Sequence, residues 1–208
     1  MTIIGWIHVA WLLPAYLLGA VPTSYLVARW AAGMDLREFG SRNLGATNLY
    51  RLLGWKAAIP VGLFDVAKGA APVLAFLGTG GQPRWWALVV GMAAVVGHVY
   101  SPFVRFKGGK GIAAAAGAFL AYTPGAIAAV AVVWAALVFT TGYVSLGSIL
   151  AAVSFPLCVA LLYPASGALW IAAGAAAFVV FAHRSNIRRL LSGTEARFGE
   201  ARRKSPAA

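Results

Sequence analysis

The stretch "IIGWIHVAWLLPAYLLGAVPTSYLVARWAA", residues 3–32, is almost entirely apolar. A helix needs about 20 apolar residues to cross a hydrocarbon core of about 30 Å, so this run is long enough to span a membrane. No cation precedes it, and it far exceeds the roughly 7–15 apolar residues of a signal-peptide core. We therefore interpret it as a retained membrane span.

The rest of the chain continues this pattern. Its 208 residues are 61% hydrophobic and include only five acids, and breaks at charges, Gly/Pro clusters and aromatic belts mark the ends of further apolar runs. The sequence predicts one domain, residues 1–208, folded as an all-α polytopic membrane helix bundle of seven transmembrane helices, with five or six as alternatives. The predicted helices cover residues 4–31, 57–77, 85–104, a short fourth helix at "IAAAAGAFLAY", 125–141, 146–163 and 166–182.

The cations divide unevenly between the two sides of this predicted bundle. One side holds Arg84 alone, whereas the other holds the basic tail, about residues 183–208, together with Arg29, Arg37, Arg42, Arg51, Lys56, Arg105, Lys107 and Lys110. Positive charge favours the cytoplasmic side, which predicts an outside N-terminus and a cytoplasmic C-terminus. A tail that contacts anionic membrane lipids explains cations such as Arg202, Arg203 and Lys204.

Two polar loops on the basic side contain more than topology requires. "GSRNLGATNLYR", residues 40–51, and "KGGKG", residues 107–111, combine cations with glycines and lead into helices, where free amides and the positive end of the helix dipole favour an anion. "YVSLGS" and "HRSNIRRL" fall on the same face. "KGGKG" lacks the spacing of a nucleotide P-loop and no strand precedes it, so the pattern indicates phosphate binding of another kind.

In chain order, "GSRNLGATNLYRLLG", "DVAKG", "GHVY", "FKGGKGIA", "YVSLGS" and "HRSNIRRLLSGTEARFG" resemble the motifs of the bacterial membrane acyltransferases that use acyl phosphate to acylate glycerol 3-phosphate. The resemblance covers nearly the whole chain. It implies seven helices in the bacterial inner membrane with the motifs inside, and a first step of phospholipid synthesis. Acyl phosphate and sn-glycerol 3-phosphate would give 1-acylglycerol 3-phosphate (lysophosphatidic acid) and phosphate, without acyl-CoA or acyl carrier protein as direct donor.

Three positions depart from the pattern of that family. Arg42 stands where the family commonly has glycine, Ala114 where it often has threonine, and Gly142 where it often has a basic residue. We expect these changes to affect the affinity for donor or acceptor and to leave the class of reaction unchanged.

Phosphate substrates call for a site that is cationic and poor in carboxylate, because each phosphoryl group carries about −1.5 to −2 charge. Arg51 offers a bidentate fork, and Lys110 offers a point charge beside the amides of Gly108, Gly109 and Gly111. The resemblance implies that the donor phosphate is bound by Ser41, Asn43, Gly45, Ala46, Thr47 and Asn48. It implies that Ser148, His183 and Asn186 hold the glycerol phosphate, with Ser145 as a weaker candidate.

The predicted catalytic residues are Ser41, Arg51, Lys110 and His183. The chain has no Ser-His-Asp arrangement, and acyl phosphate is already an activated anhydride, so no protein nucleophile is needed. His183, with an ordinary pKa near 6.5, is the candidate base among the motifs, although a structural hydrogen bond explains it equally well. We favour a third possibility, in which a substrate phosphate accepts the hydroxyl proton.

Other polar residues receive structural interpretations. Asp65 and Lys68 are expected to form an ion pair one turn apart, and His98 is expected to be a packed polar side chain. We predict no metal and no other cofactor, since no cluster has the spacing of metal ligands. The alternative function is a small anion transporter or channel. Nucleic-acid binding is not expected, because the net charge of +12 gathers on one membrane face.

Overall fold

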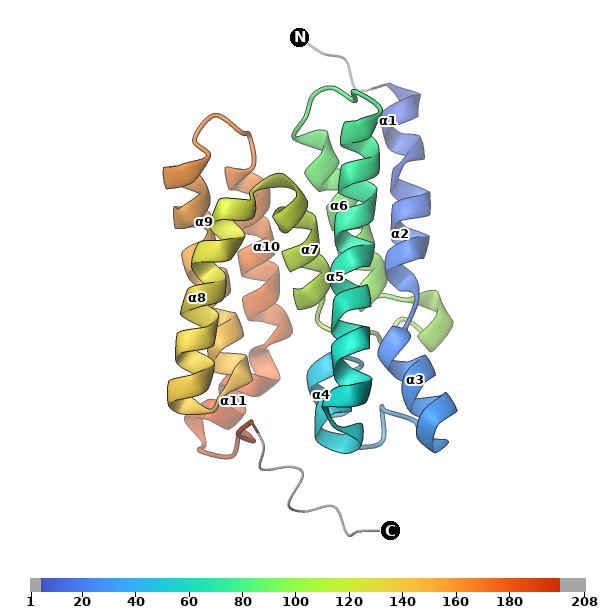
Figure 1. Ribbon diagram of the computed structural model, residues 1–208, viewed down its shortest axis with the longest axis vertical. Helices are drawn as coiled ribbons and strands as arrows, with labels where there is room; N and C mark the ends of the chain where they lie inside the picture. Colours follow the sequence, from blue (N-terminus) through green and yellow to red (C-terminus); the bar gives the residue numbers. More distant parts are fainter. Residues whose placement is uncertain (1–4, 199–208) are drawn as a thin grey trace.

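The computed structural model describes residues 5–198, and its regular structure in this range is helical (Figure 1). The helices are α1 (Trp6–Ala10), α2 (Leu12–Ala20), α3 (Thr23–Ala32), α4 (Ala46–Leu53), α5 (Trp55–Gly78), α6 (Trp86–Val99), the 3-10 turn η1 (Pro102–Val104), α7 (Ile112–Tyr122), α8 (Pro124–Thr141), α9 (Val144–Leu162), α10 (Leu169–Ala182) and α11 (Arg184–Leu191). Residues 199–208, which include Arg202, Arg203 and Lys204, lie outside the described part.

The prediction of an all-α bundle of apolar helices is confirmed. Five helical stretches in the described range are long and apolar enough to cross a membrane: Trp6–Ala32, Trp55–Gly78, Trp86–Val104, Pro124–Thr141 and Val144–Leu162. Two more apolar helices are shorter, Ile112–Tyr122 and Leu169–Ala182. Each of the predicted apolar segments therefore coincides with helical structure, and the fourth is short as expected.

The first and third segments are interrupted where the sequence prediction made them continuous. Pro22 has no N–H to donate and disfavours a helical conformation in the residue before it, so α2 ends at Ala20 and α3 begins at Thr23. The third segment is also interrupted. α6 ends at Val99, and Pro102 begins the 3-10 turn η1 in place of a continued α-helix. The backbone therefore changes direction after α6.

Two short amphipathic helices lie in segments that the sequence analysis treated as polar loops. α4 buries Asn48 and Leu49, and α11 buries Asn186. Their sequences, "ATNLYRLL" and "RSNIRRLL", alternate apolar and polar residues at helical spacing. Both helices lie at the same end of the bundle (Figure 1), so two of the polar motifs are brought to one end of the molecule.

The bundle has two groups of helices, with α8, α9 and α10 beside the group formed by α2, α5, α6 and α7 (Figure 1). α5 and α7 pack through glycine. A Cβ on Gly117 would overlap the carbonyl oxygen of Val66, and one on Gly69 would overlap that of Ala114. Small residues at such crossings let helix backbones approach closely inside a membrane. Phe119 of α7 stacks edge-on against Phe155 of α9, with ring centroids 4.7 Å apart, and so joins the two groups.

A buried ion pair lies inside this bundle, as the sequence predicts. Lys68 Nζ lies 2.8 Å from Asp65 Oδ1, and both side chains are at most 3% exposed. The same ammonium group donates to the carbonyl oxygen of Val21 at 2.9 Å. Lys68 thereby neutralises a buried acid and satisfies a carbonyl at the break between α2 and α3.

We predict that Gly117→Ala destabilises the protein by about 1–3 kcal/mol, since the added methyl group forces α5 and α7 apart. Gly174, in α10, is the matched control, because nothing lies within 4 Å of its potential Cβ. Gly174→Ala should be neutral or stabilise by about 1 kcal/mol through helix propensity. Thermal unfolding of the purified variants in detergent measures both effects, and equal behaviour would show that close packing of α5 on α7 is unimportant.

Candidate active site

A cavity of about 770 Å³ opens at the end of the bundle that carries α4 and α11. Its wall is formed by the loop before α4, the loop between η1 and α7, the start of α9 and the residues around α11. Every site residue predicted from the sequence lines this cavity. Motifs separated by more than a hundred positions in the chain therefore share one space.

The first loop, residues 40–45, is held in place by Asn48. The Asn48 side chain, 1% exposed, accepts from the amide of Ser41 at 2.9 Å and donates to the carbonyl oxygens of Phe39 and Leu36 at 3.1 and 3.4 Å. Its amide group is thus engaged within the protein, which corrects the expectation that Asn48 binds phosphate directly. The first amides of α4, which begins at Ala46, have no partner within the helix and lie at the cavity.

In the "KGGKG" loop, too, groups that were predicted to bind phosphate are already hydrogen-bonded within the protein. The amide of Gly108 donates to the carbonyl oxygen of Val99 at 2.9 Å, and that of Gly109 donates to His98 O at 3.1 Å. These two amides donate to carbonyl groups at the end of α6 and are therefore not free to bind an anion. The free amides of this region belong instead to the first turn of α7, where Ile112 and Ala113 line the cavity, beside the ammonium group of Lys110.

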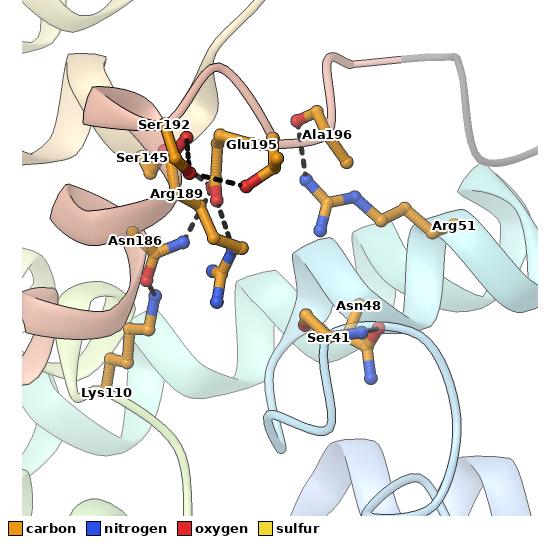
Figure 2. A network of polar contacts seen from close by, with 11 residues as sticks. Ser41, Asn48, Arg51, Lys110, Ser145, Asn186, Arg189, Ser192, Glu195 and Ala196 are labelled. Carbon is orange, nitrogen blue, oxygen red and sulfur yellow. Dashed lines mark hydrogen bonds and ion pairs between the residues drawn. The ribbon is translucent and has the colours of Figure 1, made fainter.

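A chain of polar contacts joins Lys110 to the C-terminal segment (Figure 2). Lys110 donates to Asn186 Oδ1. Asn186 Nδ2 donates to Glu195 Oε1 at 2.6 Å, and the Ser145 hydroxyl donates to the same oxygen at 2.7 Å. Arg189 Nε donates to Glu195 Oε2 at 2.6 Å. A single carboxylate therefore orients three donors from α9 and α11.

Glu195 and Arg189 are the site residues that the sequence analysis missed. The cavity is cationic as expected, with seven Lys and Arg residues in its lining, but the two buried acids Glu195 and Asp65 line it as well. A signal was present: Glu195 is one of only five acids in the chain and stands within a strongly basic segment. Arg189 follows Asn186 by three residues, and this spacing puts both side chains on one face of a helix.

The C-terminal segment also contacts α4. Arg51 Nη2 donates to the carbonyl oxygen of Ala196 at 3.2 Å. Figure 2 shows Arg51 and Lys110 on opposite sides of the polar contacts around Glu195. The ring of Phe198 stacks on Tyr50 at 4.7 Å, and the amide of Phe198 donates to Gly142 O at 2.7 Å. Residues 195–198 thus connect α4 with the start of α9.

The buried cations of the cavity are short of counter-charge. The pKa of Lys110 is lowered to about 8, mainly by burial; Glu195 opposes this lowering, and the charges of Arg189 and Arg51 contribute to it. Burial also lowers the pKa of Arg51. For Glu195, burial alone would raise the pKa, but the hydrogen bonds from Asn186, Ser145 and Arg189 outweigh it and keep the pKa below its usual value. An additional anion would be stabilised in this environment.

The imidazole of His183 has a defined orientation. Its Nδ1 lies 2.8 Å from the carbonyl oxygen of Val179, and a carbonyl only accepts, so Nδ1 carries the hydrogen and Nε2 of the neutral ring is an acceptor. The pKa of His183 is lowered to about 4, mainly by burial and also by the charge of Lys110, against the opposing effects of the Val179 hydrogen bond and Glu195. His183 is consequently neutral near pH 7 and is a weak base.

The serine hydroxyls of α9 are engaged within the protein. Ser145 donates to Glu195, as described above, and the Ser148 hydroxyl donates to Val144 O at 2.9 Å and accepts from Trp134 Nε1 at 3.2 Å. Both hydroxyls retain acceptor capacity only, so a phosphate would have to displace an existing contact to receive a hydrogen bond. This reduces the expected role of Ser148 as a direct ligand.

The three departures from the family pattern have different surroundings. Arg42 lies at the cavity with a φ of 58°, a left-handed conformation that glycine adopts with less strain. Ala114 is fully buried and its carbonyl lies against Gly69 of α5, so a threonine hydroxyl here would face a helix crossing. Gly142 ends α8 with a φ of 80°.

Within residues 5–198, no group of three or more His, Cys, Asp or Glu side chains is placed to hold a metal ion. The polar groups of the cavity are instead guanidinium, ammonium, amide and backbone N–H groups. Such donors suit phosphate and carboxylate oxygens. The arrangement can bind anions and stabilise negative charge that develops on oxygen during a reaction.

Comparison with known proteins supports this interpretation. A family model described as "Glycerol-3-phosphate acyltransferase" matches residues 9–193. A glycerol-3-phosphate acyltransferase of Geobacter sulfurreducens is 46% identical to this chain, with 88% of this chain and 94% of the relative covered. One of Chlorobaculum parvum is 42% identical, covering 91% of this chain and 95% of the relative.

Solved structures agree with the sequence relatives. The crystal structure of PlsY, an integral membrane glycerol 3-phosphate acyltransferase, in its glycerol 3-phosphate form superposes with a TM-score of 0.87 at 39% identity, covering 93% of this chain and 96% of that one. Its lysophosphatidic acid form gives a TM-score of 0.85 at 37% identity with the same coverage. The shared fold extends over the whole helix bundle.

Proposed function

This chain belongs to the glycerol-3-phosphate acyltransferase family and is an integral membrane acyltransferase, and from that premise we propose its donor and product. The protein transfers an acyl group from acyl phosphate to the 1-hydroxyl of sn-glycerol 3-phosphate. The products are lysophosphatidic acid and inorganic phosphate. The whole chain serves this one reaction as a single domain.

One observation carries this proposal: the N-termini of two helices, each suited to bind an anion, line the same cavity. The start of α4 lines it together with Arg51 from the last turn of that helix, and the start of α7 lines it together with Lys110, which lies just before that helix. A reaction between two phosphate-bearing substrates needs two anion sites close together. That a relative has been solved in a glycerol 3-phosphate form and in a lysophosphatidic acid form supports the acceptor and the product.

We assign the two sites as follows. The loop of residues 40–47 and Arg51 bind the phosphate of the acyl donor, whose chain extends among apolar helices. Lys110, Asn186 and the first amides of α7 bind the glycerol phosphate. Binding of this anion breaks the contact between Lys110 and Asn186, so that the ammonium and the amide both turn towards the substrate.

In the chemical step, the 1-hydroxyl oxygen attacks the acyl carbon, and the bond from that carbon to the phosphate oxygen breaks. The hydroxyl proton passes to a phosphate oxygen of a substrate, and the donor phosphate leaves as inorganic phosphate. The low pKa of His183, about 4, makes it a poorer base than a phosphate group, whose second pKa is about 6. Arg51 stabilises the charge on the leaving phosphate, and Lys110 holds the acceptor in place. Ser41, at the edge of the donor loop, supplies a hydroxyl donor.

The transporter or channel that was the alternative from sequence is replaced by this acyltransferase, because the relatives that cover nearly the whole chain are enzymes of one kind. We further propose that the two shorter helices, α7 and α10, also cross the membrane, which gives seven spans. The cavity then faces the cytoplasm of a bacterial cell and the N-terminus lies outside, since the cations gather at the cavity end.

The donor assay tests the proposal directly. Purified protein, incubated with acyl phosphate and labelled glycerol 3-phosphate, should form labelled lysophosphatidic acid. Gly45→Val should raise the KM for acyl phosphate, since bulk at the start of α4 obstructs the donor phosphate, whereas Asn186→Ala should raise chiefly the KM for glycerol 3-phosphate. Labelled product with acyl-CoA but none with acyl phosphate would reject the proposed donor.

The pKa of Lys110 predicts a pH profile. As the pH rises through about 8, Lys110 in the free enzyme loses its proton and its attraction for an anion, so kcat/KM for glycerol 3-phosphate should fall. On the acid side it should fall below about pH 6, where the substrate phosphate loses its second charge. Lys110→Arg should shift the alkaline fall to higher pH, because guanidinium does not titrate there. An unchanged alkaline fall in Lys110→Arg would assign it to another group.

Thiol labelling tests the orientation. In a Cys158→Ser background, single cysteines at the exposed residues Lys56 and Lys107 should be protected from an impermeant thiol reagent in intact cells. A cysteine at Thr79, exposed at the other end of α5, should react. Permeabilised cells provide the control, since all three sites should then label. Reaction at Lys107→Cys in intact cells would reverse the proposed orientation.

A further inference from the structure

His98 is a buried polar side chain that the proposed mechanism does not use. It lies in the last turn of α6 and lines the inner end of the cavity together with Asp65 of α5. Its Nδ1 is fully buried and has no hydrogen-bond partner in the described part of the protein. Asp65 Oδ1 lies 3.7 Å from it, beyond the length of a hydrogen bond.

Asp65 fixes which way the ring faces. The carboxylate accepts from Lys68 Nζ at 2.8 Å and from Thr23 Oγ1 at 3.2 Å, so α5 itself and α3 hold it. Nδ1 is the ring nitrogen that faces this carboxylate, and because a carboxylate only accepts, it favours an N–H at Nδ1. Nε2 lies on the opposite edge of the ring.

That opposite edge meets the junction of the two phosphate loops. A Cβ on Gly109 would overlap both His98 Nε2 and the carbonyl oxygen of Leu44. The backbone of Gly109 is therefore sandwiched between the imidazole and the loop that leads into α4. His98 O also accepts from the amide of Gly109 at 3.1 Å. The ring, the "KGGKG" loop and the first loop are thus stacked in that order.

We infer that His98, supported by Asp65, is a positioning residue that sets the separation of the loops at residues 40–45 and 107–111. This inference rests on the proposed function, because those loops then hold the two substrates of one reaction. The ring acts as a spacer through Gly109. Its size and direction fix how the acyl carbon approaches the acceptor hydroxyl.

A spacer affects the two kinetic constants differently. Each anion keeps its own set of ligands, so both KM values should change little when the ring is removed. The alignment of the reacting atoms is lost, however, and a misplacement near 1 Å can lower kcat roughly a hundredfold. We therefore expect His98→Ala to reduce kcat by about that factor while glycerol 3-phosphate binding, measured by calorimetry, is retained.

Two further variants separate a spacer from a general base. His98→Phe keeps the ring and has no basic nitrogen, whereas His98→Asn keeps an N–H towards Asp65 but is too short to reach Gly109. Phenylalanine should restore most of the kcat lost in His98→Ala, and asparagine should not. Loss of kcat in both variants to the level of His98→Ala would overturn the inference, as would full activity in His98→Ala.

The control is His8→Ala, which removes a half-buried histidine at the far end of the bundle and should leave kcat unchanged. Thermal unfolding of each variant distinguishes lost alignment from lost folding: the spacer role predicts that His98→Phe and His98→Asn differ in kcat more than in stability. A wild-type protein that makes no product from acyl phosphate would reject the proposed donor, whereas wild-type and His98→Ala proteins of equal activity would reject the role of His98 alone.

Discussion

The buried ion pair between Asp65 and Lys68 fixes where the apolar bundle ends and the polar cavity begins. Each charge alone would cost about 2.5–3.5 kcal/mol at the centre of a membrane helix, so neither is stable there without the other. Lys68 also donates to the carbonyl oxygen of Val21, next to Pro22 at the break between α2 and α3. This hydrogen bond joins the first span to α5. Because α5 continues from α4, the donor loop is anchored to the same pair through the helix that carries it.

The starts of two helices line the cavity, and one carboxylate orients several of its polar side chains. The first turns of α4 and α7 supply N–H groups that the helices cannot satisfy internally, and Arg51 and Lys110 add cations whose burial is incompletely compensated. Glu195 holds Ser145, Asn186 and Arg189 in fixed directions. This acid reduces the net positive charge of the cavity. In return it orients the hydrogen-bond donors, which without it would include cations that repel one another.

Much of the fold follows from the sequence because its signals are local. Apolar runs that are uniform over many residues predict helices whatever their neighbours are, and the short segment at Ile112–Tyr122 was recognisable from its length. The helices α4 and α11 were missed, because each has only about two amphipathic turns, and so short a pattern among glycines and cations resembles a polar loop. The interruptions at Pro22 and Pro102 were present in the sequence but were outweighed by the hydrophobicity around them.

By itself, the sequence determined the class of fold, the gathering of cations at one end of the helices and the set of motif residues that face one cavity, because hydrophobicity, charge and motif identity are properties of the chain. Only the tertiary structure decided which donors are free. The amides of Gly108 and Gly109 are used by the end of α6, the Asn48 side chain is used by its own loop, and Glu195 reaches the cavity from a basic tail. Hydrogen-bonding capacity is shared among groups that meet in space, and pairings between distant segments arise only when the bundle has folded.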